Sequence, residues 1–454
     1  MVAAALAATT LCLTGPLAAA PSVAADGGTP KPGPTDNGAD TTPPRRWTVS
    51  GRPVTSGTTR DEAPVLQPGR YTETLAADST VRYYRLPRSR GATVHFSVAG
   101  RDGSGRAPTD SESFDLTLGL ADGTECATTS TSRYDSDHAH PALIDAVVLD
   151  GSPVARTGVL SDECRRATTL IASVQRDAGG GHPMPSEIVY LEEPPIRTGR
   201  LPDAAKGRVL DAFRAPASSR TTPVRGSGSF SGAPTLTTGS YRDSVQIGEQ
   251  VFYRVRLAFG QRAAFTVEVP RNGSGFRAVQ TYNVSVDTYG PDRSQVSSAG
   301  GDLSTTATVY EGTDPETIGQ FTAPVRYLNR DDPDADLRRD LGPAQVEDTA
   351  LAGYFTFGIL VGTPGGDIRP GGVPALPMRI SVQVKGTATS GPRYEGRQVV
   401  APGLPPDATS EQSEGPDTLL LVGVGSGVVL IVLLGAAGWA VRRRTRRSRR
   451  AHTG

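Results

Sequence analysis

The chain has 454 residues, enough for two or three domains, with 53 Gly, 37 Pro and only 6% aromatic residues. This composition is typical of short strands joined by Gly/Pro turns and argues against a helical bundle. The 47 basic and 47 acidic residues balance, but seven arginines lie after position 441, so the section before them carries 40 basic and 47 acidic residues, and this net charge of −7 argues against non-specific nucleic-acid binding.

The first 25 residues carry no charge and end in the small residues Ser22-Val23-Ala24-Ala25, which suit signal peptidase. They predict a cleaved secretory signal. Cys12 follows Leu11, which is too large for a lipobox, so an ordinary signal peptide is favoured over a lipoprotein. The next stretch, 26–46, is rich in Pro, Gly, Thr and Asp and predicts a flexible leader.

One motif occurs twice in the body of the chain. The frame A-P-x-L-x-x-G-x-Y spans 63–71 and recurs, 170 residues later, at 233–241. Its glycines predict turns in which Gly takes a positive φ, as in a type II turn. The structural residues of this repeat are Gly69, Tyr71, Gly239 and Tyr241. Each copy leads into a similar series of strands, so most of the chain is predicted to be one β unit used twice.

Alternating apolar and polar residues predict the strands of both copies. The predicted strands are 71–75, 81–86, 93–98, 114–118, 168–174 and 187–191, then 263–269, 282–286, 354–361 and 378–384. Phe114 is matched with Tyr282 in this alignment. The period of two predicts one buried and one wet face, as in a sandwich. His95 is therefore expected on the solvent face.

Two cysteines, Cys126 and Cys164, remain after signal cleavage. An exported chain meets an oxidising environment, so the pair predicts a disulfide. Closing 38 residues contributes up to about 4 kcal/mol on the chain-entropy model. The alternatives are two free thiols or a metal pair, and the metal pair is disfavoured because no second Cys or His lies beside either cysteine.

Two polar clusters are weak candidates for metal sites. The first consists of Asp135, Asp137, His138 and His140. The second consists of Asp332, Asp334 and Asp336. The first has ligand types that bind a divalent cation but no counterpart in copy two. The second resembles a calcium loop, yet Leu337 and Pro343 occupy the positions of the required Gly and Glu. Solvated polar loops are favoured for both clusters, and no cofactor is expected.

Residues 418–441 form a charge-free apolar run of 24 residues. As a helix it spans about 36 Å, enough to cross a bilayer core of about 30 Å. The arginines that follow, 442–454, predict a cytoplasmic tail with the bulk of the chain outside the cell. Gly423 and Gly427 form a G-x-x-x-G, so a homodimer through this helix is one alternative. A cell-wall sorting signal is disfavoured because 404–408 lacks the Thr-Gly of the sorting motif.

These patterns predict an all-β fold: two jelly-roll-like β-sandwich domains in tandem and a C-terminal transmembrane helix. The predicted boundaries are 1–25 for the signal peptide, 26–46 for the leader, 47–195 for sandwich 1, 196–226 for a linker, 227–390 for sandwich 2, 391–417 for a stalk linker, 418–441 for the membrane helix and 442–454 for the tail.

The repeat motif, the following Tyr84-Arg85 and Tyr253-Arg254 pairs, and Gly91 or Gly260 before an alternating strand resemble the bacterial pre-peptidase C-terminal domain. The resemblance implies a compact jelly-roll sandwich with an accessory or binding role. It extends to exported actinobacterial surface proteins that carry such units beside a von Willebrand A domain. It therefore implies an envelope polymer or another surface protein, such as one with a von Willebrand A domain, as partner.

No nucleophile, base and orienting group stand at a recognisable spacing, and G-x-S-x-G, H-E-x-x-H and P-loop motifs are missing from the sequence. We therefore expect a non-catalytic cell-surface binding protein on a type I membrane anchor, with its bulk extracellular. The alternative is an envelope-associated hydrolase or metal-dependent enzyme with a site in the long loops 127–163 or 296–349.

Overall fold

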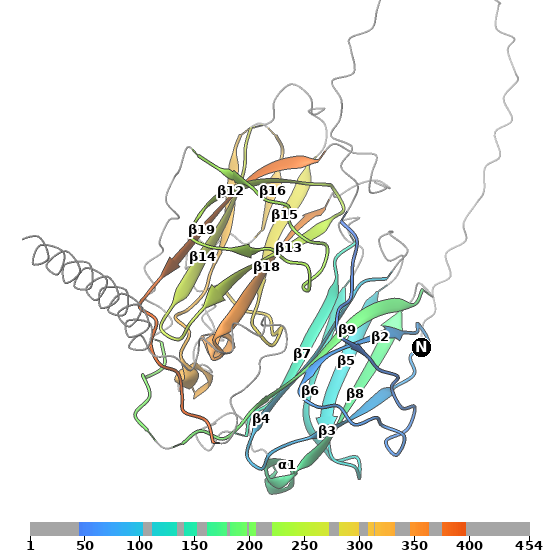
Figure 1. Cartoon of the computed structure of the whole chain (residues 1–454). Coiled ribbons are helices and arrows are strands. Elements are labelled where there is room, and N and C mark those ends of the chain that lie inside the picture. Colours follow the sequence, from blue (N-terminus) through green and yellow to red (C-terminus); the bar gives the residue numbers. More distant parts are fainter. Residues whose placement is uncertain are drawn as a thin grey trace, which may run out of the picture. The chain divides into compact units, whose positions relative to one another are not determined.

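The fold is that of a computed structural model (Figure 1). Every residue that the structure describes belongs to the unit Asp40–Gly454. The residues that it describes are 45–102, 111–133, 140–151, 161–178, 182–197, 199–205, 220–271, 281–298, 307–312, 314–331, 346–362 and 375–395. The predicted signal peptide, membrane helix and tail lie outside these ranges.

Sandwich 1 is built from two sheets whose apolar faces meet in one core. One sheet has the order β1-β2-β9-β4-β7 and the other β3-β8-β5-β6. The strands are β1 (Arg52–Pro53), β2 (Gly69–Leu75), β3 (Arg82–Pro87), β4 (Thr93–Gly100), β5 (Glu112–Gly119), β6 (Glu125–Arg133), β7 (Leu143–Leu149), β8 (Thr169–Ala178) and β9 (Met184–Glu193).

Sandwich 2 repeats this arrangement. Its sheets have the orders β10-β12-β19-β14-β17 and β11-β13-β18-β15-β16. The strands are β10 (Thr222–Pro223), β11 (Thr235–Leu236), β12 (Gly239–Val245), β13 (Gln250–Leu257), β14 (Arg262–Val269), β15 (Tyr282–Tyr289), β16 (Ala307–Tyr310), β17 (Glu316–Phe321), β18 (Gly353–Gly362) and β19 (Leu376–Lys385). The predicted linker 196–226 thus already contains β10, which pairs with β12 as β1 pairs with β2.

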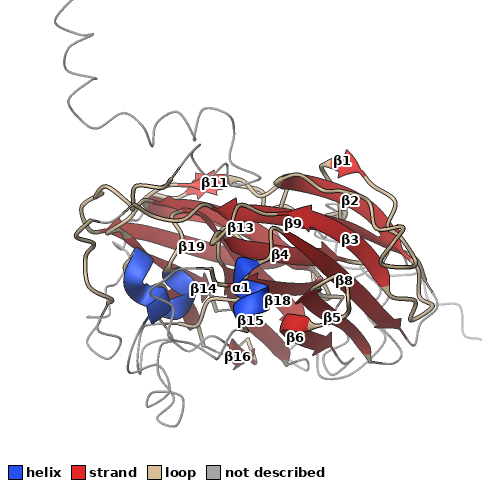
Figure 2. Cartoon of the chain, turned by 90° about the horizontal axis from the view of Figure 1, so that it is seen from below, coloured by secondary structure: helices blue, strands red, loops and turns tan. Residues whose placement is uncertain are grey.

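Eight strands in each sandwich follow the order of a jelly roll, because the first lies beside the eighth and the third between the eighth and the sixth. Helices are few in the described part: α1 (Asp162–Arg166) and the short 3-10 helices η2 (Tyr327–Asp331) and η3 (Glu347–Thr349). Figure 2 shows that strands are the main secondary structure of the described part. The prediction of two all-β sandwiches in tandem is confirmed.

The repeated motif holds a segment against the sandwich in the same way in both copies. Leu66 and Leu236 lie in the two cores. The Tyr71 hydroxyl donates to the Gln67 carbonyl at 2.7 Å, and the Tyr241 hydroxyl donates to the carbonyl of the residue four positions earlier at 3.0 Å. The tyrosine therefore closes the loop that precedes its own strand.

The glycines of the motif do not take the predicted positive φ. Gly69 and Gly239 begin strands β2 and β12, and neither is among the described glycines with positive φ. A Cβ on Gly239 would lie 3.5 Å from the Tyr241 hydroxyl, an ordinary van der Waals contact, so the fold does not require a glycine there. Positive φ occurs instead at Gly91 (76°) and Gly260 (84°), which precede β4 and β14.

The predicted alignment of the next strand is wrong by two residues. Leu118 pairs with Ala172, and Thr288 pairs with Phe357. Ala172 and Phe357 occupy equivalent positions, because each also pairs with the tyrosine of the Tyr-Arg pair. Leu118 therefore corresponds to Thr288, and Phe114 corresponds to Val284 instead of Tyr282.

The stretches that we predicted as long loops contain strands. Residues 127–163 hold most of β6 and all of β7, and 296–349 holds β16, β17, η2 and η3. The predicted disulfide is confirmed: Cys126 in β6 is bonded to Cys164 in α1, with a Cα–Cα distance of 5.6 Å. The bond thus ties the edge strand of one sheet to the helix that precedes β8.

Candidate functional site

Strand β4 is buried on both faces. Val94, Phe96 and Val98 point into the core of sandwich 1. The opposite face, which we expected to be wet, is covered by sandwich 2, and Ala99 packs in one apolar cluster with Phe230. The other buried members of that cluster are Ala142, Ala233, Phe252 and Tyr289.

His95 lies within this interface and is 5% exposed, so its assignment to the solvent face was wrong. Its Nδ1 lies 2.7 Å from the Asp292 carboxylate of sandwich 2, and its Nε2 lies 3.2 Å from the Glu193 carboxylate of β9. Glu193 also pairs with Arg330 at 2.9 Å and accepts a hydrogen bond from the Tyr394 hydroxyl at 2.7 Å. We call these five residues the His95 cluster.

The electrostatics of the His95 cluster favour its charged form. Burial lowers the pKa of His95, but the hydrogen bonds to Asp292 and Glu193 outweigh this and raise the pKa to about 9. Burial raises the pKa of Glu193, yet Arg330 and His95 outweigh it and lower the pKa to about 2. Since both ring nitrogens hold carboxylates, the imidazolium joins the sandwiches and is poorly placed to act as a base.

A second ion pair crosses the same interface. The Arg293 guanidinium binds the Glu187 carboxylate of β9 and lies over the Phe230 ring, 4.9 Å from its centroid. Arg293 has a φ of 70°, which is uncommon for a residue with a Cβ. Its counterpart in the equivalent turn of sandwich 1 is Gly123, with a φ of 99°. The docking contact is therefore made from a strained position.

Of the first predicted metal cluster, only His140 falls within the described residues. It is buried at the interface, where its backbone N–H donates to the Gly248 carbonyl at 3.1 Å and its Nε2 lies 3.0 Å from Asp102 Oδ1. Burial lowers the pKa of His140. Asp135, Asp137 and His138 lie outside the described ranges.

The second predicted cluster, Asp332, Asp334 and Asp336, also lies outside the described ranges, as do Gly423 and Gly427. In the part of the chain that the structure describes, no three or more His, Cys, Asp or Glu side chains are grouped so that they could hold a metal ion. Nor does that part contain a helix with the length and apolar character needed to cross a membrane.

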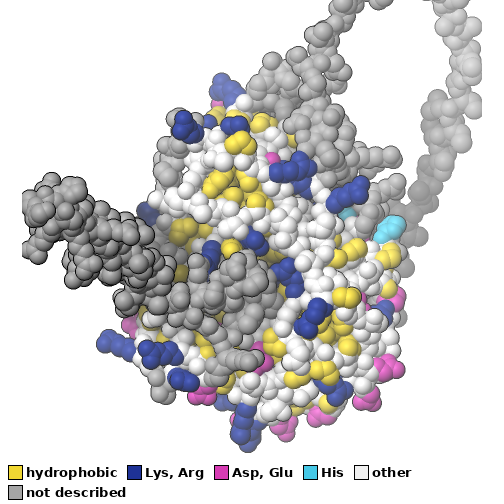
Figure 3. All heavy atoms as spheres, viewed as in Figure 1, with side chains coloured by type: hydrophobic (Ala, Val, Ile, Leu, Met, Phe, Trp, Pro, Cys, Tyr) yellow, Lys and Arg dark blue, Asp and Glu magenta, His cyan; other side chains and the backbone are white. Residues whose placement is uncertain are grey.

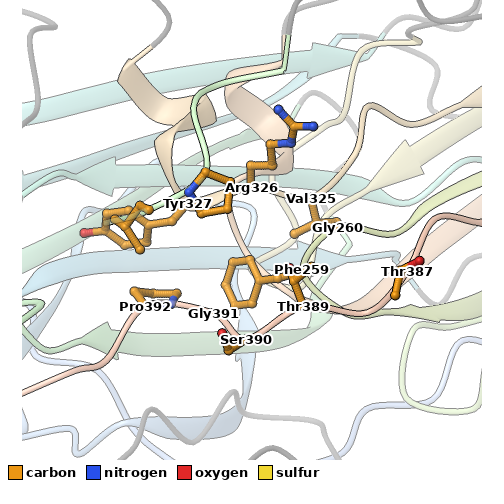
Figure 4. A pocket seen from close by; sticks show the side chains of 12 residues that line it. Phe259, Gly260, Val325, Arg326, Tyr327, Thr387, Thr389, Ser390, Gly391 and Pro392 are labelled. Atoms are coloured by element: carbon orange, nitrogen blue, oxygen red, sulfur yellow. The ribbon is translucent and has the colours of Figure 1, made fainter. Parts of the chain in front are cut away.

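A hollow of about 190 Å³ lies beside the His95 cluster. It is lined by Leu201, Pro202, Phe259, Gly260, Val325, Arg326, Tyr327, Thr387, Thr389, Ser390, Gly391 and Pro392. In Figure 4 the Phe259 ring lies in the middle of the hollow, between Tyr327 and Pro392 on one side and Thr387 on the other. The Arg330 guanidinium of the His95 cluster lies over the Tyr327 ring, 4.0 Å from the ring centroid.

The hollow is made where the predicted linker and the predicted stalk meet. The Arg197 N–H donates to the Arg393 carbonyl at 2.6 Å, and the Glu395 N–H donates to the Pro195 carbonyl at 2.7 Å. Residues 393–395 are therefore not a free stalk, because they pair with residues 195–197. Sequence reasoning missed this site because its walls come from four segments far apart in the chain.

Comparison with known proteins gave only distant likenesses. No family model matches the chain, and no curated protein matches it. Among solved structures, the N-terminal CBM22-1-CBM22-2 tandem domain from Paenibacillus barcinonensis is 12% identical, with a TM-score of 0.17 over 70% of this chain and 86% of that one. The tandem CBM51 modules of a family 98 glycoside hydrolase from Streptococcus pneumoniae are 11% identical, with a TM-score of 0.19 over 69% of this chain and 83% of theirs.

The extracellular domain of ANXUR2 from Arabidopsis thaliana is also similar, at 8% identity and a TM-score of 0.16, over 71% of this chain and 92% of that one. At TM-scores this low, these likenesses carry no argument about what the chain binds.

Proposed function

We propose that the chain is a non-catalytic binding protein of the cell surface, which holds one unit of an envelope polysaccharide in the hollow beside Phe259. The observation that carries this proposal is the lining of the hollow. An aromatic face, that of Phe259, lies near the hydroxyl groups of Thr387, Thr389 and Ser390. A sugar ring has an apolar face for the aromatic ring and hydroxyls at its rim for the polar groups.

The size of the hollow supports a polymer rather than a free small molecule. Sites for whole ligands usually measure about 300–1,000 Å³, whereas this hollow measures about 190 Å³. It fits a single ring, whose neighbours along the polymer would lie outside it. Affinity for one unit is then weak, and repeated encounters along the polymer compensate.

The surface supports a polar ligand as well. On the face seen in Figure 3, exposed hydrophobic side chains form small groups between polar ones. A large apolar patch is what an obligate protein partner would need. The buried charges of the His95 cluster, at the junction of the two sandwiches, are paired with one another.

In this proposal the ectodomain resembles the pre-peptidase C-terminal domain, is exported by the signal 1–25 and is held by the span 418–441, with its C-terminus in the cytoplasm. Protease added to intact cells should remove nearly all of the chain and leave a small C-terminal fragment. A protected ectodomain in wall-stripped cells would contradict this topology.

The binding proposal is tested by co-sedimentation of the chain with purified envelope polysaccharide. Phe259→Ala should weaken binding about tenfold, the equivalent of about 1.4 kcal/mol. Tyr83→Ala is the matched control, because Tyr83 is also a half-buried aromatic residue but lies outside the hollow, in β3. Equal affinity of the Phe259 variant and the wild type would refute the site, and capture of a protein instead of polysaccharide would favour a protein partner.

A further inference from the structure

The last residues of the predicted leader and those that follow cross the junction of the two sandwiches. We call residues 45–50 the strap. The Trp47 indole N–H donates to the Pro185 carbonyl of sandwich 1 at 2.9 Å, while its ring packs on Phe252 of sandwich 2, 6.4 Å between centroids. Thr48 bonds Ser229, and the Ser50 N–H donates to Glu187. Arg45 and Arg46, which we assigned to the leader, thus belong to this strap.

The strap begins with an arginine whose side chain is enclosed by sandwich 2 and is only 5% exposed. Its Nη2 donates to both carboxylate oxygens of Asp243, at 2.6 and 2.7 Å, and to the Ser244 carbonyl at 3.1 Å. Its Nη1 donates to Glu249 at 2.8 Å, and its Nε donates to the Gly226 carbonyl at 2.9 Å. All three nitrogens of the Arg45 guanidinium therefore have acceptors.

These acceptors are positioned by sandwich 2 itself. Asp243 accepts hydrogen bonds from the Tyr253 hydroxyl at 2.6 Å and from the Gly226 N–H at 2.7 Å. Glu249 accepts one from the Gln246 N–H at 3.2 Å. The two carboxylates thus have partners on their own sandwich that hold them in place, so the site does not depend on the strap for its shape.

The backbone of the strap also has a place prepared for it. A Cβ on Gly228 would lie 2.5 Å from the Arg46 carbonyl oxygen and 2.7 Å from that of Arg45. No side chain other than that of glycine leaves room for the strap at this point. Sandwich 2 accordingly recognises both the guanidinium and the chain that carries it.

The described residues of sandwich 1 do not form this site. Its equivalent of Asp243 is Glu73, which also accepts a hydrogen bond from the core tyrosine, Tyr84, at 2.7 Å. Ser56, the equivalent of Gly226, donates to Glu73 through its hydroxyl at 2.6 Å and through its N–H at 3.0 Å, so here a serine hydroxyl binds the carboxylate. The arginine site is a specialisation of the second copy.

We propose that sandwich 2 carries a binding site for the arginine side chain of an extended peptide, and that the chain's own Arg45 fills this site as a tethered ligand. The fork of N–H groups on a planar guanidinium matches two carboxylates and two carbonyls, whereas a lysine ammonium would satisfy them poorly. Tethering gives Arg45 an effective concentration in the millimolar range, so a competing peptide enters only when the strap is displaced.

The test uses the full chain with Arg45→Ala and measures its thermal unfolding midpoint against added N-acetyl-arginine amide. At ten times the dissociation constant, the midpoint should rise by about 3 °C, and it should go on rising with the logarithm of the concentration. N-acetyl-lysine amide should give a much smaller rise. Wild type, whose site is filled, and Arg46→Ala, which changes the exposed neighbour, should respond to neither compound beyond the lysine level.

The double variant Arg45→Ala with Asp243→Asn should lose the response to the arginine compound. If Arg45→Ala alone is unfolded in buffer, the same comparison is read as the folded fraction that each compound recovers. Equal effects of the arginine and lysine compounds, or equal effects on wild type and Arg45→Ala, would overturn the proposal.

Discussion

Strands β4 and β14 occupy the same position in the two sandwiches, and only β4 is buried on both faces. Their inward residues are alike: Phe96 and Phe265 both lie in their cores. Their outward residues differ, because Ala264 stands where β4 has His95. The repeat thus preserves what each sandwich needs in order to fold, and the contact between the sandwiches depends on residues outside the repeated pattern.

The loops next to the interface differ between the two sandwiches in the same way. Sandwich 2 docks through Phe230 and Arg293. The equivalent residues of sandwich 1 are Arg60, which is exposed, and Gly123. The Arg60 guanidinium lies over the Tyr83 ring, 5.6 Å from the ring centroid. This loop therefore contacts its own sandwich, whereas the loop with Phe230 covers the other sandwich.

We expect the largest difference in stability between equivalent positions of the two sandwiches at Glu193. Glu193→Ala should lower the free energy of unfolding by about 3–5 kcal/mol, because it leaves the buried His95 and Arg330 charges without their shared carboxylate. Lys385→Ala changes the equivalent position of β19, which is exposed, and should stay within about 0.5 kcal/mol of wild type. Denaturant titration of both variants measures these free energies of unfolding. Equal losses of stability would mean that the contacts of Glu193 at the interface contribute no extra stability.

The docking loops offer the next largest effect. Phe230→Ala removes an 8% exposed ring from the interface and should lower the stability by about 3 kcal/mol. Arg60→Ala, at the equivalent site, removes only an exposed cation–π contact and should lower it by less than about 1 kcal/mol. Reversed magnitudes in chemical unfolding would show that sandwich 2 is not held through Phe230.

The His95 cluster should make the interface pH-dependent. A histidine whose folded pKa is raised contributes its stability fully below the unfolded value of 6.5 and loses it as the pH rises through about 9. Glu193, whose pKa is lowered to about 2, contributes above 4.5 and loses this as the pH falls toward 2. The wild type should therefore lose on the order of 2 kcal/mol relative to His95→Gln between pH 6 and 10. A constant difference between the two across that range would contradict the assignment.

The smallest difference in stability is expected between a glycine with positive φ, Gly260, and one without it, Gly239. Gly260→Ala should lower the stability by about 1–2 kcal/mol, because φ is 84° and the new Cβ would meet the Thr387 carbonyl at 2.5 Å. Gly239→Ala should be close to neutral, since its nearest contact is an ordinary 3.5 Å. Thermal unfolding of the two variants checks this. A larger loss of stability for Gly239→Ala would support the positive-φ turn that we first predicted at Gly239.

The sequence was sufficient for the strands with clear alternation and for the Cys126–Cys164 disulfide. It failed for β6, whose Thr- and Ser-rich sequence has no apolar period, although its residues alternate between exposed and half-buried along most of the strand. It also failed for His95, because a period of two reports which residues face the core and says nothing about what covers the other face. A signal was present: His95 and Glu193 are replaced by Ala264 and Lys385 in copy two.

The candidate site was beyond the reach of the sequence for a related reason. Phe259 follows β13, Tyr327 lies in η2, and Pro392 follows β19. Each is unremarkable in its own segment, and only the tertiary fold brings the three together. Arg45 was assigned to a flexible leader because its neighbours are Pro and Thr, and its two acceptor carboxylates lie about two hundred residues away.

The pairing of 393–395 with 195–197 has a mechanical consequence. A pull applied to the chain beyond residue 395 reaches the Arg197–Arg393 and Glu395–Pro195 hydrogen bonds first, together with the Tyr394–Glu193 contact. Much of that load is then passed to β9 of sandwich 1, bypassing the strands of sandwich 2. The force thus bypasses sandwich 2, which can stay folded under tension until the hydrogen bonds between 393–395 and 195–197 are broken.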